Sequence, residues 1–425
     1  MDTFKIRGGR PLIGSIPISG SKNAALPLMA GALLADGPVT IENTPLLQDI
    51  FTFNNVIRVT GARVEFEEEK RSLSIDPSGM YHFESPYDLV RKMRASFYMA
   101  GALIGASGYA RVSLPGGCAW GPRPVNLHLE GLKAFGADIE MDKGYVVAKA
   151  PGGRLPGGVF DMNPSSVGAT VNLILAAVKA KGTSVIRNAA REPDVVNLCE
   201  NLNRLGARIS GLGTAELIIE GTDSISGGTM YNTPDRIETG TFMIAAAMIP
   251  GSDLILEKTD TEDLGSFVDT FRKLGCGLEL TKHSIRVTAP ESLPPISIDT
   301  AIYPGFPTDL QAQWATMMTA ANGTSIITDH IYPDRFSYIP ELNRLGASIT
   351  QKENLAIIQG ATPLTGASVM STDLRASVSL VIAGMAASGE TDVLRVYHLD
   401  RGYEFLEEKL NKVGADIRRV QEAGS

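Results

Sequence analysis

One pattern of apolar and polar positions recurs six times along the chain. In each copy, apolar residues at helical spacing, as in residues 195–205, lead to a glycine followed by a small residue, any residue and an aliphatic one. Two short alternating segments follow, as in residues 207–210 and 217–220. The pattern predicts a helix and then two strands, so each copy is a mixed α/β unit. The six glycines lie 68 to 75 residues apart and are Gly61, Gly136, Gly206, Gly275, Gly346 and Gly414.

A second helix is predicted earlier in each copy, where an alanine-rich apolar run ends at a glycine and a strand-like segment follows. Glycine commonly ends helices because it adopts the left-handed conformation without steric cost. These glycines are Gly37, Gly108, Gly182, Gly251, Gly323 and Gly389. The residues 14 positions before them are Asn23, Arg94, Gly168, Ile237, Asp309 and Arg375. We therefore expect six equivalent helix N-termini at these positions.

The two ends of the chain complete each other. The last copy stops after Ile417 without its closing strands, and the first residues have the spacing of the missing piece. Gly8, Pro11, Gly14 and Asn23 match Gly360, Pro363, Gly366 and Arg375 at a constant offset of 352. We expect two domains of three units each, residues 22–229 and residues 1–21 with 230–425. Crossings near Ser21 and residues 228–229 would make a hinged clamp around a cleft; the alternative is a solenoid of six stacked units.

Composition and charge narrow the class of protein. The chain has 425 residues, of which 44% are hydrophobic and 20% charged, as in a globular protein with large cores. The net charge of −8 disfavours a broad nucleic-acid or anionic-membrane surface but allows a local cationic pocket. The longest apolar runs, near residues 26–35 and 241–250, are shorter than the roughly 20 residues of a membrane span. No secretory signal opens the chain, so we expect a soluble cytoplasmic protein.

Cations at predicted helix starts point to an anionic ligand. Unpaired N–H groups and the helix dipole already favour anions there, and a cation at the same place opposes the dipole. Lys22, Arg94 and Arg375 occupy such positions. The alternative for each is a surface ion pair.

Two further arginines are related by the repeat. Arg123 and Arg401 stand 13 residues before Gly136 and Gly414, at matching predicted helix starts in the two domains. A guanidinium presents a planar fork to carboxylate or phosphate, so this pair could grip a ligand that carries both.

Two aspartates at helix starts are candidate general bases. Asp309 precedes an apolar helix that contains Trp314, and Asp373 precedes Arg375. Either carboxylate could accept a proton from a substrate hydroxyl, or could simply cap its helix.

The three cysteines differ in their surroundings. Cys118 lies in a glycine- and proline-rich segment close to Arg123, where a reactive thiolate is favoured. Cys199 and Cys276 lie in helical and strand patterns and are interpreted as core thiols. His128 is interpreted as structural, and neither metal-ligand spacing nor a phosphate or dinucleotide loop is present, so no metal or cofactor is expected.

Nine motifs carry a resemblance to a known family. They are residues 18–25 (ISGSKNAA), 93–96 (MRAS), 115–118 (PGGC), 123–125 (RPV), 166–170 (SVGAT), 235–240 (DRIETG), 306–309 (FPTD), 372–376 (TDLRA) and 400–404 (DRGYE). Over essentially its whole length the sequence resembles the UDP-N-acetylglucosamine 1-carboxyvinyltransferases, which are enolpyruvyl transferases. The resemblance implies a two-domain inside-out α/β barrel. It also implies transfer of the enolpyruvyl group of phosphoenolpyruvate to the sugar 3′-hydroxyl with release of phosphate, which begins peptidoglycan synthesis and serves cell shape and division.

The resemblance also implies roles for single residues. Lys22, Arg123 and Arg401 would contact phosphoenolpyruvate, and Asn23 and Asp309 would contact the sugar, with Asp309 as the base at the 3′-hydroxyl. Cys118 would protonate the phosphoenolpyruvate methylene and be alkylated by fosfomycin. Further substrate contacts are implied for Arg94, Arg335, Asp373 and Arg375, and on the nucleotide side for Arg123, Pro124, Val125, Asn126, Leu127, Ser166, Val167, Gly168 and Ile331.

Two positions depart from the family pattern. Asn126 stands where aspartate is common, and Pro164 and Ser165 precede the SVG motif where a lysine is usual. Both departures concern contacts to the uridine rather than the reaction.

Two other functions stay open at this point. A shikimate-pathway enolpyruvyl transferase shares the repeat and the phosphoenolpyruvate chemistry, but Cys118 and residues 19–23 argue against it. A non-catalytic interaction protein of six repeats would not require the Cys118 segment or the helix-start cations.

Overall fold

The chain divides into two compact units in the computed structural model, which describes residues 2–90, 93–114 and 125–421. Unit 1 comprises residues 1–19 and 234–425, and unit 2 comprises residues 20–233. The chain therefore crosses between units after Ser19 and after Thr233. The second crossing follows residues 228–231 because these form a strand that pairs within unit 2.

Six four-stranded sheets repeat one topology. In each sheet the first strand runs parallel to the second, and the third and fourth add antiparallel. The sheets of unit 2 are β14 (Gly228–Tyr231), β3 (Val39–Glu42), β5 (Ser72–Asp76), β4 (Arg63–Glu67); β6 (Glu84–Ser85), β7 (Tyr109–Ser113), β9 (Tyr145–Lys149), β8 (Asp138–Asp142); and β10 (Val159–Asp161), β11 (Thr183–Arg187), β13 (Glu216–Glu220), β12 (Arg208–Ser210).

The three sheets of unit 1 follow the same plan. They are β2 (Ile13–Pro17), β15 (Asp253–Glu257), β17 (Ser284–Thr288), β16 (Gly277–Leu280); β18 (Ile298–Asp299), β19 (Thr324–Thr328), β21 (Leu355–Gln359), β20 (Ser348–Lys352); and β22 (Ser368–Met370), β23 (Glu390–Leu394), β1 (Asp2–Arg7), β24 (Asp416–Gln421). Strand β1 pairs antiparallel with both β23 and β24, so that Phe4 lies opposite Val393 and Arg419. The first strand of the chain thus completes the sheet of the last repeat.

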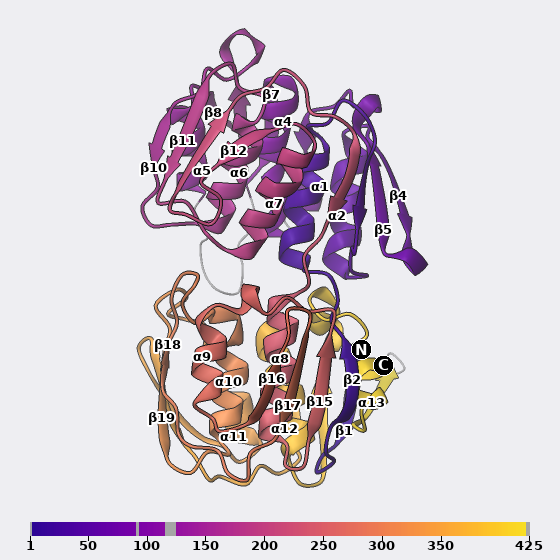
Figure 1. Ribbon diagram of the computed structural model, residues 1–425, viewed down its shortest axis with the longest axis vertical. Helices are drawn as coiled ribbons and strands as arrows, with labels where there is room; N and C mark the ends of the chain where they lie inside the picture. The colour runs from indigo at the N-terminus through magenta and orange to yellow at the C-terminus, as the bar shows by residue number, and fades with distance from the viewer. Residues whose placement is uncertain (1, 91–92, 115–124, 422–425) are drawn as a thin grey trace. The chain divides into compact units, whose positions relative to one another are not determined.

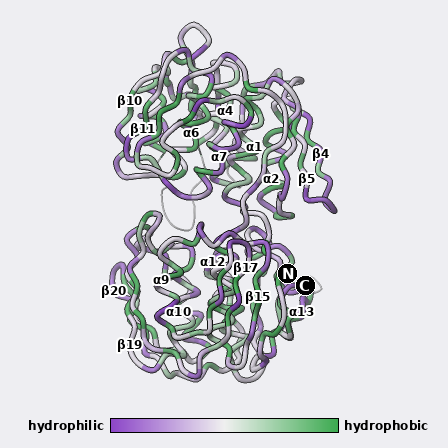
Figure 2. Tube along the Cα trace, viewed as in Figure 1, coloured by the Kyte–Doolittle hydropathy of each residue, from purple (hydrophilic) through white to green (hydrophobic). Residues whose placement is uncertain are grey.

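Three apolar helices lie at the centre of each unit. In unit 2 these are α1 (Lys22–Ala32), α4 (Met99–Ser107) and α6 (Val167–Ala177), and in unit 1 they are α8 (Arg236–Met248), α10 (Gln311–Met318) and α12 (Leu374–Ala386). The three helices of a unit pack against one another, and Figure 1 shows sheets outside them. Figure 2 colours long stretches of α6 and α12 as hydrophobic. A helix that is apolar on all sides must be buried, which explains the inside-out α/β barrel.

The remaining helices within the described ranges are amphipathic or short. They are α2 (Gln48–Val59), α3 (Tyr87–Val90), α5 (Asn126–Ala134), α7 (Pro193–Arg204), α9 (Ser266–Arg272), α11 (Ile339–Arg344) and α13 (Leu406–Lys412). Short 3₁₀ segments include η3 (Arg94–Tyr98), η6 (Thr308–Leu310) and η7 (Val396–Arg401). None of the helices within the described ranges is long and apolar enough to cross a membrane.

The predicted helix ends need one correction. Among the six glycines, only Gly108 caps its helix directly, in the left-handed conformation with φ +77°. The other central helices end earlier; α12, for example, ends at Ala386, and Gly389 with φ +88° lies in the turn that leads into β23. Most of these glycines therefore lie in the turn between the helix and the following strand, and not at the end of the helix itself.

Candidate functional site

The six predicted helix N-termini lie at or next to helix starts. In unit 2, Asn23 follows Lys22 as the second residue of α1, Arg94 opens η3 ahead of α4, and Gly168 is the second residue of α6. In unit 1, Ile237 and Arg375 are the second residues of α8 and α12, and Asp309 lies in η6 ahead of α10. The starts of α10 and α12 are brought close, since Asp309 Oδ2 lies 3.8 Å from Nη2 of Arg375.

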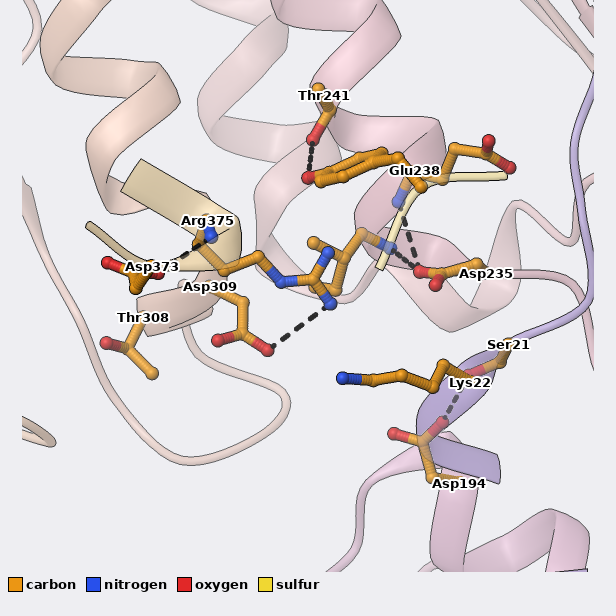
Figure 3. Close-up of polar contacts among 12 residues, drawn as sticks. Ser21, Lys22, Asp194, Asp235, Glu238, Thr241, Thr308, Asp309, Asp373 and Arg375 are labelled. Carbon is orange, nitrogen blue, oxygen red and sulfur yellow. Dashed lines mark hydrogen bonds and ion pairs between the residues drawn. The ribbon is translucent and has the colours of Figure 1, made fainter. Parts of the chain in front are cut away.

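Lys22 is a buried cation with a defined partner. Only 7% of the residue is exposed, and its Nζ lies 3.0 Å from Oδ2 of Asp49 on α2. Burying a charge is unfavourable unless it is paired, so Asp49 makes this position of the ammonium possible. The preceding residue is also fixed, since Ser21 caps α1 and its Oγ donates to Asp194 Oδ1 at 2.9 Å (Figure 3). The surface ion pair considered for Lys22 is wrong, because the pair is buried.

His128 lies beside the start of α6, and burial keeps it neutral. It is 4% exposed, its Nδ1 lies 2.8 Å from Nδ2 of Asn172, and Phe97 packs on its ring edge-on. Burial, with a smaller contribution from the charge of Arg94, lowers the pKa of His128 to about 3. Its ring contacts the position of Gly168, where an added Cβ would lie 3.3 Å from His128 Cε1. The structural interpretation of His128 is confirmed.

The free energy of unfolding should decrease as the pH is lowered from neutral, because His128 is buried in its neutral form. Between pH 6.5 and about 3, the unfolded histidine binds a proton that the folded one does not, and folding is penalised by about 2 kcal/mol at pH 5. We expect His128→Asn, whose amide can still accept from Asn172, to lose less thermal stability than wild type between pH 7 and pH 5. The measurement is the shift of the unfolding midpoint. Exposed His82→Asn is the control, and equal shifts in all three proteins would contradict the expectation.

The predicted nucleotide contacts in unit 2 lie at the starts of α5 and α6. Val125 is the residue before α5, Asn126 and Leu127 begin it, and the Asn126 side chain is exposed. Ser166 caps α6, with its Oγ accepting from the Ala169 N–H, and Val167 and Gly168 follow it. All six residues thus lie at the polarised N-termini of two helices that pack together. Asn23, next to Lys22, is half-buried.

Asp309 is held between two guanidiniums in unit 1. Its Oδ1 lies 2.7 Å from Nη1 of Arg335, and its Oδ2 lies 3.8 Å from Nη2 of Arg375. Figure 3 shows Arg375 extending towards Asp309. Burial alone would raise the pKa of Asp309, but the charges of Arg335 and Arg375 outweigh it and hold the pKa well below its ordinary value. Its side chain caps neither η6 nor α10, whose N-cap residue is Leu310, so the capping alternative for Asp309 is wrong.

Asp373 is a helix cap, which was the alternative to a general base for both aspartates. Its Oδ1 accepts from the backbone N–H groups of Arg375 at 2.7 Å and Ala376 at 3.2 Å, capping α12. The two candidate bases therefore differ. Asp373 accepts hydrogen bonds from a helix terminus, whereas the side-chain partners of Asp309 among the described residues are the guanidiniums of Arg335 and Arg375.

Arg375 is almost completely buried. It is 3% exposed, and its guanidinium carbon lies 5.4 Å from the ring centre of Tyr403. Within the part of the chain that the structure describes, its Nη1 has no hydrogen-bond partner. A buried guanidinium nitrogen without a partner is costly. It can be satisfied by an anionic or carbonyl ligand.

Arg401 does not begin a helix. It is the last residue of η7, and α13 begins only at Leu406, because residues 402–405 form a turn in which Phe405 has φ +48°. The segment η7 packs against α12, which carries Arg375. Ile331 also lies in unit 1, where its N–H donates to Asp329 Oδ1 at 2.8 Å.

Several predicted residues lie outside the described ranges. These are Cys118, Arg123 and Pro124. The predicted meeting of Lys22, Arg123 and Arg401 on one ligand stays a prediction. The interpretation of Cys199 as a core thiol is confirmed, since it is completely buried and burial raises its pKa to about 12; Cys276 is partly buried.

Sequence reasoning missed the side chains that support the charged residues. Asp49 pairs with Lys22, Asp194 holds Ser21, and Gln311 donates to the carbonyl of Arg335 at 2.7 Å. Nothing in the local pattern links these residues to their partners. The only local signal is that Asp49 and Asp194 are acidic residues in the first turns of α2 and α7, a position that the helix dipole favours.

The geometry suits recognition of anions. No group of three or more histidine, cysteine, aspartate or glutamate side chains that could hold a metal occurs among the described residues. The buried cations Lys22 and Arg375 lie at helix starts, whose dipoles also attract negative charge, and the half-buried Arg335 pairs with Asp309.

Comparison with known proteins agrees with the fold and the motifs. Residues 6–410 match the family model described as EPSP synthase (3-phosphoshikimate 1-carboxyvinyltransferase). Relatives named UDP-N-acetylglucosamine 1-carboxyvinyltransferase, from Chloroherpeton thalassium and Chlorobium limicola, are 52% and 50% identical. Each alignment covers 99% of this chain and 97% or 98% of the relative.

Solved structures of enolpyruvyl transferases have the same fold as this chain. The enolpyruvyl transferase NikO from Streptomyces tendae superposes with a TM-score of 0.90 at 26% identity, covering 99% of both chains. EPSP synthase from Acinetobacter baumannii superposes with a TM-score of 0.78 at 18% identity, covering 99% of this chain and 100% of that one, which supports the fold. The chain therefore belongs to the EPSP synthase family of enolpyruvyl transferases, within the group of the UDP-N-acetylglucosamine 1-carboxyvinyltransferases.

Proposed function

We propose that the chain transfers the enolpyruvyl group of phosphoenolpyruvate to the 3′-hydroxyl of UDP-N-acetylglucosamine and releases phosphate. This reaction would take place in the cytoplasm, as the first committed step of peptidoglycan precursor synthesis. The observation that carries the proposal is the identity of about 50% over nearly the whole chain to relatives that bear this activity in their name. The helix-start cations and the Asp309 cluster agree with two anionic substrates.

The proposed chemistry is addition followed by elimination. The sugar 3′-oxygen bonds to C2 of phosphoenolpyruvate, the hydroxyl proton leaves, and C3 gains a proton, which gives a tetrahedral intermediate. The C2–O bond to phosphate then breaks, C3 loses a proton and the C2–C3 double bond forms again. Negative charge on carboxylate and phosphate would be stabilised by Lys22, Arg123 and Arg401 together with helix dipoles.

Asp309 would act at the 3′-hydroxyl. Its carboxylate is ionised at neutral pH, so it can accept a hydrogen bond from the hydroxyl without first losing a proton. Its low pKa makes it a weak base while Arg335 and Arg375 face it alone. An anionic substrate that shares these guanidiniums would raise its proton affinity at the moment when the hydroxyl must be deprotonated.

Phosphate release distinguishes this function from its alternatives. The purified protein should release phosphate from phosphoenolpyruvate with UDP-N-acetylglucosamine as acceptor and not with shikimate 3-phosphate. Release with shikimate 3-phosphate would favour the activity for which the matching family model is named. No release with either acceptor would favour a non-catalytic repeat protein.

Cys118 gives a second test of the proposal. We expect Cys118→Ser to impair turnover and to abolish covalent labelling by fosfomycin, because the hydroxyl is a far weaker nucleophile than a thiolate. Mass spectrometry of the intact protein measures the labelling. Cys276→Ser is the matched control and should label as wild type does, while unchanged labelling of Cys118→Ser would exclude the assignment.

A further inference from the structure

A buried polar network lies directly behind Arg375 in unit 1, although no motif assigned it a role. It consists of Tyr403 after η7, Gln313 on α10 and Thr241 on α8. The three residues are between 0% and 2% exposed. Each comes from a different part of the chain, yet their polar groups converge on the Tyr403 hydroxyl.

The hydroxyl of Tyr403 is fixed from two sides. It lies 2.9 Å from Oγ1 of Thr241, and Nε2 of Gln313 donates to it at 3.3 Å. Gln313 Nε2 also donates to the backbone carbonyl of Asp309 at 3.0 Å. The network therefore ties the position of the Tyr403 ring to the backbone of Asp309.

The ring of Tyr403 in turn faces the guanidinium of Arg375. Their separation of 5.4 Å is within the range of a cation–π contact, which is stronger when both groups are shielded from water. The same guanidinium lies 3.8 Å from Asp309 Oδ2. Arg375 thus lies between Tyr403 and Asp309, and both of these residues are held by Gln313.

Polar side chains inside a core are destabilising unless they are satisfied, and apolar residues fill such sites at lower cost. Gln313 and Thr241 lie on two helices in which almost every residue is buried. The hydrogen bonds of Gln313 reach the Asp309 backbone and the Tyr403 hydroxyl, and the Tyr403 ring contacts Arg375. Holding Asp309 and Arg375 in a fixed orientation would explain why these polar side chains are kept in the core.

We propose that Tyr403 and Gln313 are positioning residues that hold the Arg375 guanidinium at Asp309 for the transfer reaction. This inference rests on the proposed function for its kinetic consequence, whereas the placement of Arg375 can be measured without substrate. Tyr403 and Gln313 would touch no reacting atom and would act through Arg375.

The first measurement uses the resting enzyme and the Arg375 Nε–Hε signal in a nitrogen–proton correlation spectrum, assigned by its loss in Arg375→Lys. In Tyr403→Leu we expect this signal to move or broaden, because the guanidinium loses the ring-current shift and its support. Tyr403→Phe keeps the ring and should preserve most of the shift. Phe271→Leu, which removes a buried ring on α9, is the control and should leave the signal in place.

The second measurement is kinetic. We expect Tyr403→Leu to lower kcat by about 10- to 100-fold with a smaller change in KM, because misplacing a charged group near the reacting atoms by about 1 Å has effects of this size. Gln313→Met and Tyr403→Phe should give smaller losses in the same direction, and Phe271→Leu should match wild type at equal folded fraction.

The two measurements separate the inference from the proposed function. A wild-type protein without phosphate release would reject the proposed function, while the spectra would still decide whether Tyr403 positions Arg375. An unchanged Arg375 signal in Tyr403→Leu would overturn the inference. A kcat loss no larger than that of Phe271→Leu would do the same.

Discussion

Replacing Asp309 by alanine should lower turnover by about 10² or more if its carboxylate accepts the proton of the sugar hydroxyl. The variant loses the acceptor and also leaves Arg335 and Arg375, two positive charges, facing each other without the anion between them. The measurement is kcat for phosphate release with UDP-N-acetylglucosamine, compared at equal folded fraction.

Two controls separate catalysis from the loss of an ion pair. Asp309→Asn keeps the volume and a hydrogen-bond acceptor but not the charge, so it should be folded and nearly as inactive as Asp309→Ala. Asp269→Ala removes an exposed carboxylate from a surface pair with Arg272 in the same unit and should retain activity. Near-normal rates for Asp309→Asn would reduce Asp309 to a structural partner of the two arginines.

Replacing Lys22 by methionine should lower kcat/KM for phosphoenolpyruvate by about 10² to 10³, because the proposed contact is a charge-assisted hydrogen bond to an anion. The variant should also be less stable. Asp49 would remain buried without its counter-charge, a situation that typically costs about 3–5 kcal/mol.

A double variant distinguishes these two effects. In Lys22→Met with Asp49→Leu, both members of the buried pair are replaced by apolar residues, so stability should recover while activity stays low. Lys22→Arg keeps the charge and should retain more activity than Lys22→Met. Recovery of activity together with stability in the double variant would show that Lys22 only supports the fold.

The repeat is the part of the fold that could be predicted best. Residues 195–205 were predicted as a helix and residues 217–220 as a strand, and the structure has α7 at Pro193–Arg204 and β13 at Glu216–Glu220. Amphipathic periodicity and glycine turns are local properties, and six copies of the same pattern reinforce one another. Helix ends were less accurate because the glycines lie in the following turn.

The positions of the candidate site residues could be predicted better than the residues with which they form ion pairs and hydrogen bonds. The helix-start positions of Lys22 and Arg375 follow from counting along the repeat, since capping and dipole effects act within one helical turn. The sequence left Asp309 and Asp373 equivalent, and only coordinates separated them into a carboxylate between arginines and a helix cap.

The sequence by itself determined the α/β repeat, the place where the N-terminal strand belongs and the helix ends that carry charge, because these depend on neighbours a few residues away or on copies of one pattern. Tertiary structure alone decided which group satisfies each charge. Lys22 finds Asp49 across 27 residues, Gln313 reaches Tyr403 across 90 and Ser21 reaches Asp194 across 173. Such pairs arise only when packing brings distant segments within hydrogen-bond distance, and burial then sets the strength of the interaction.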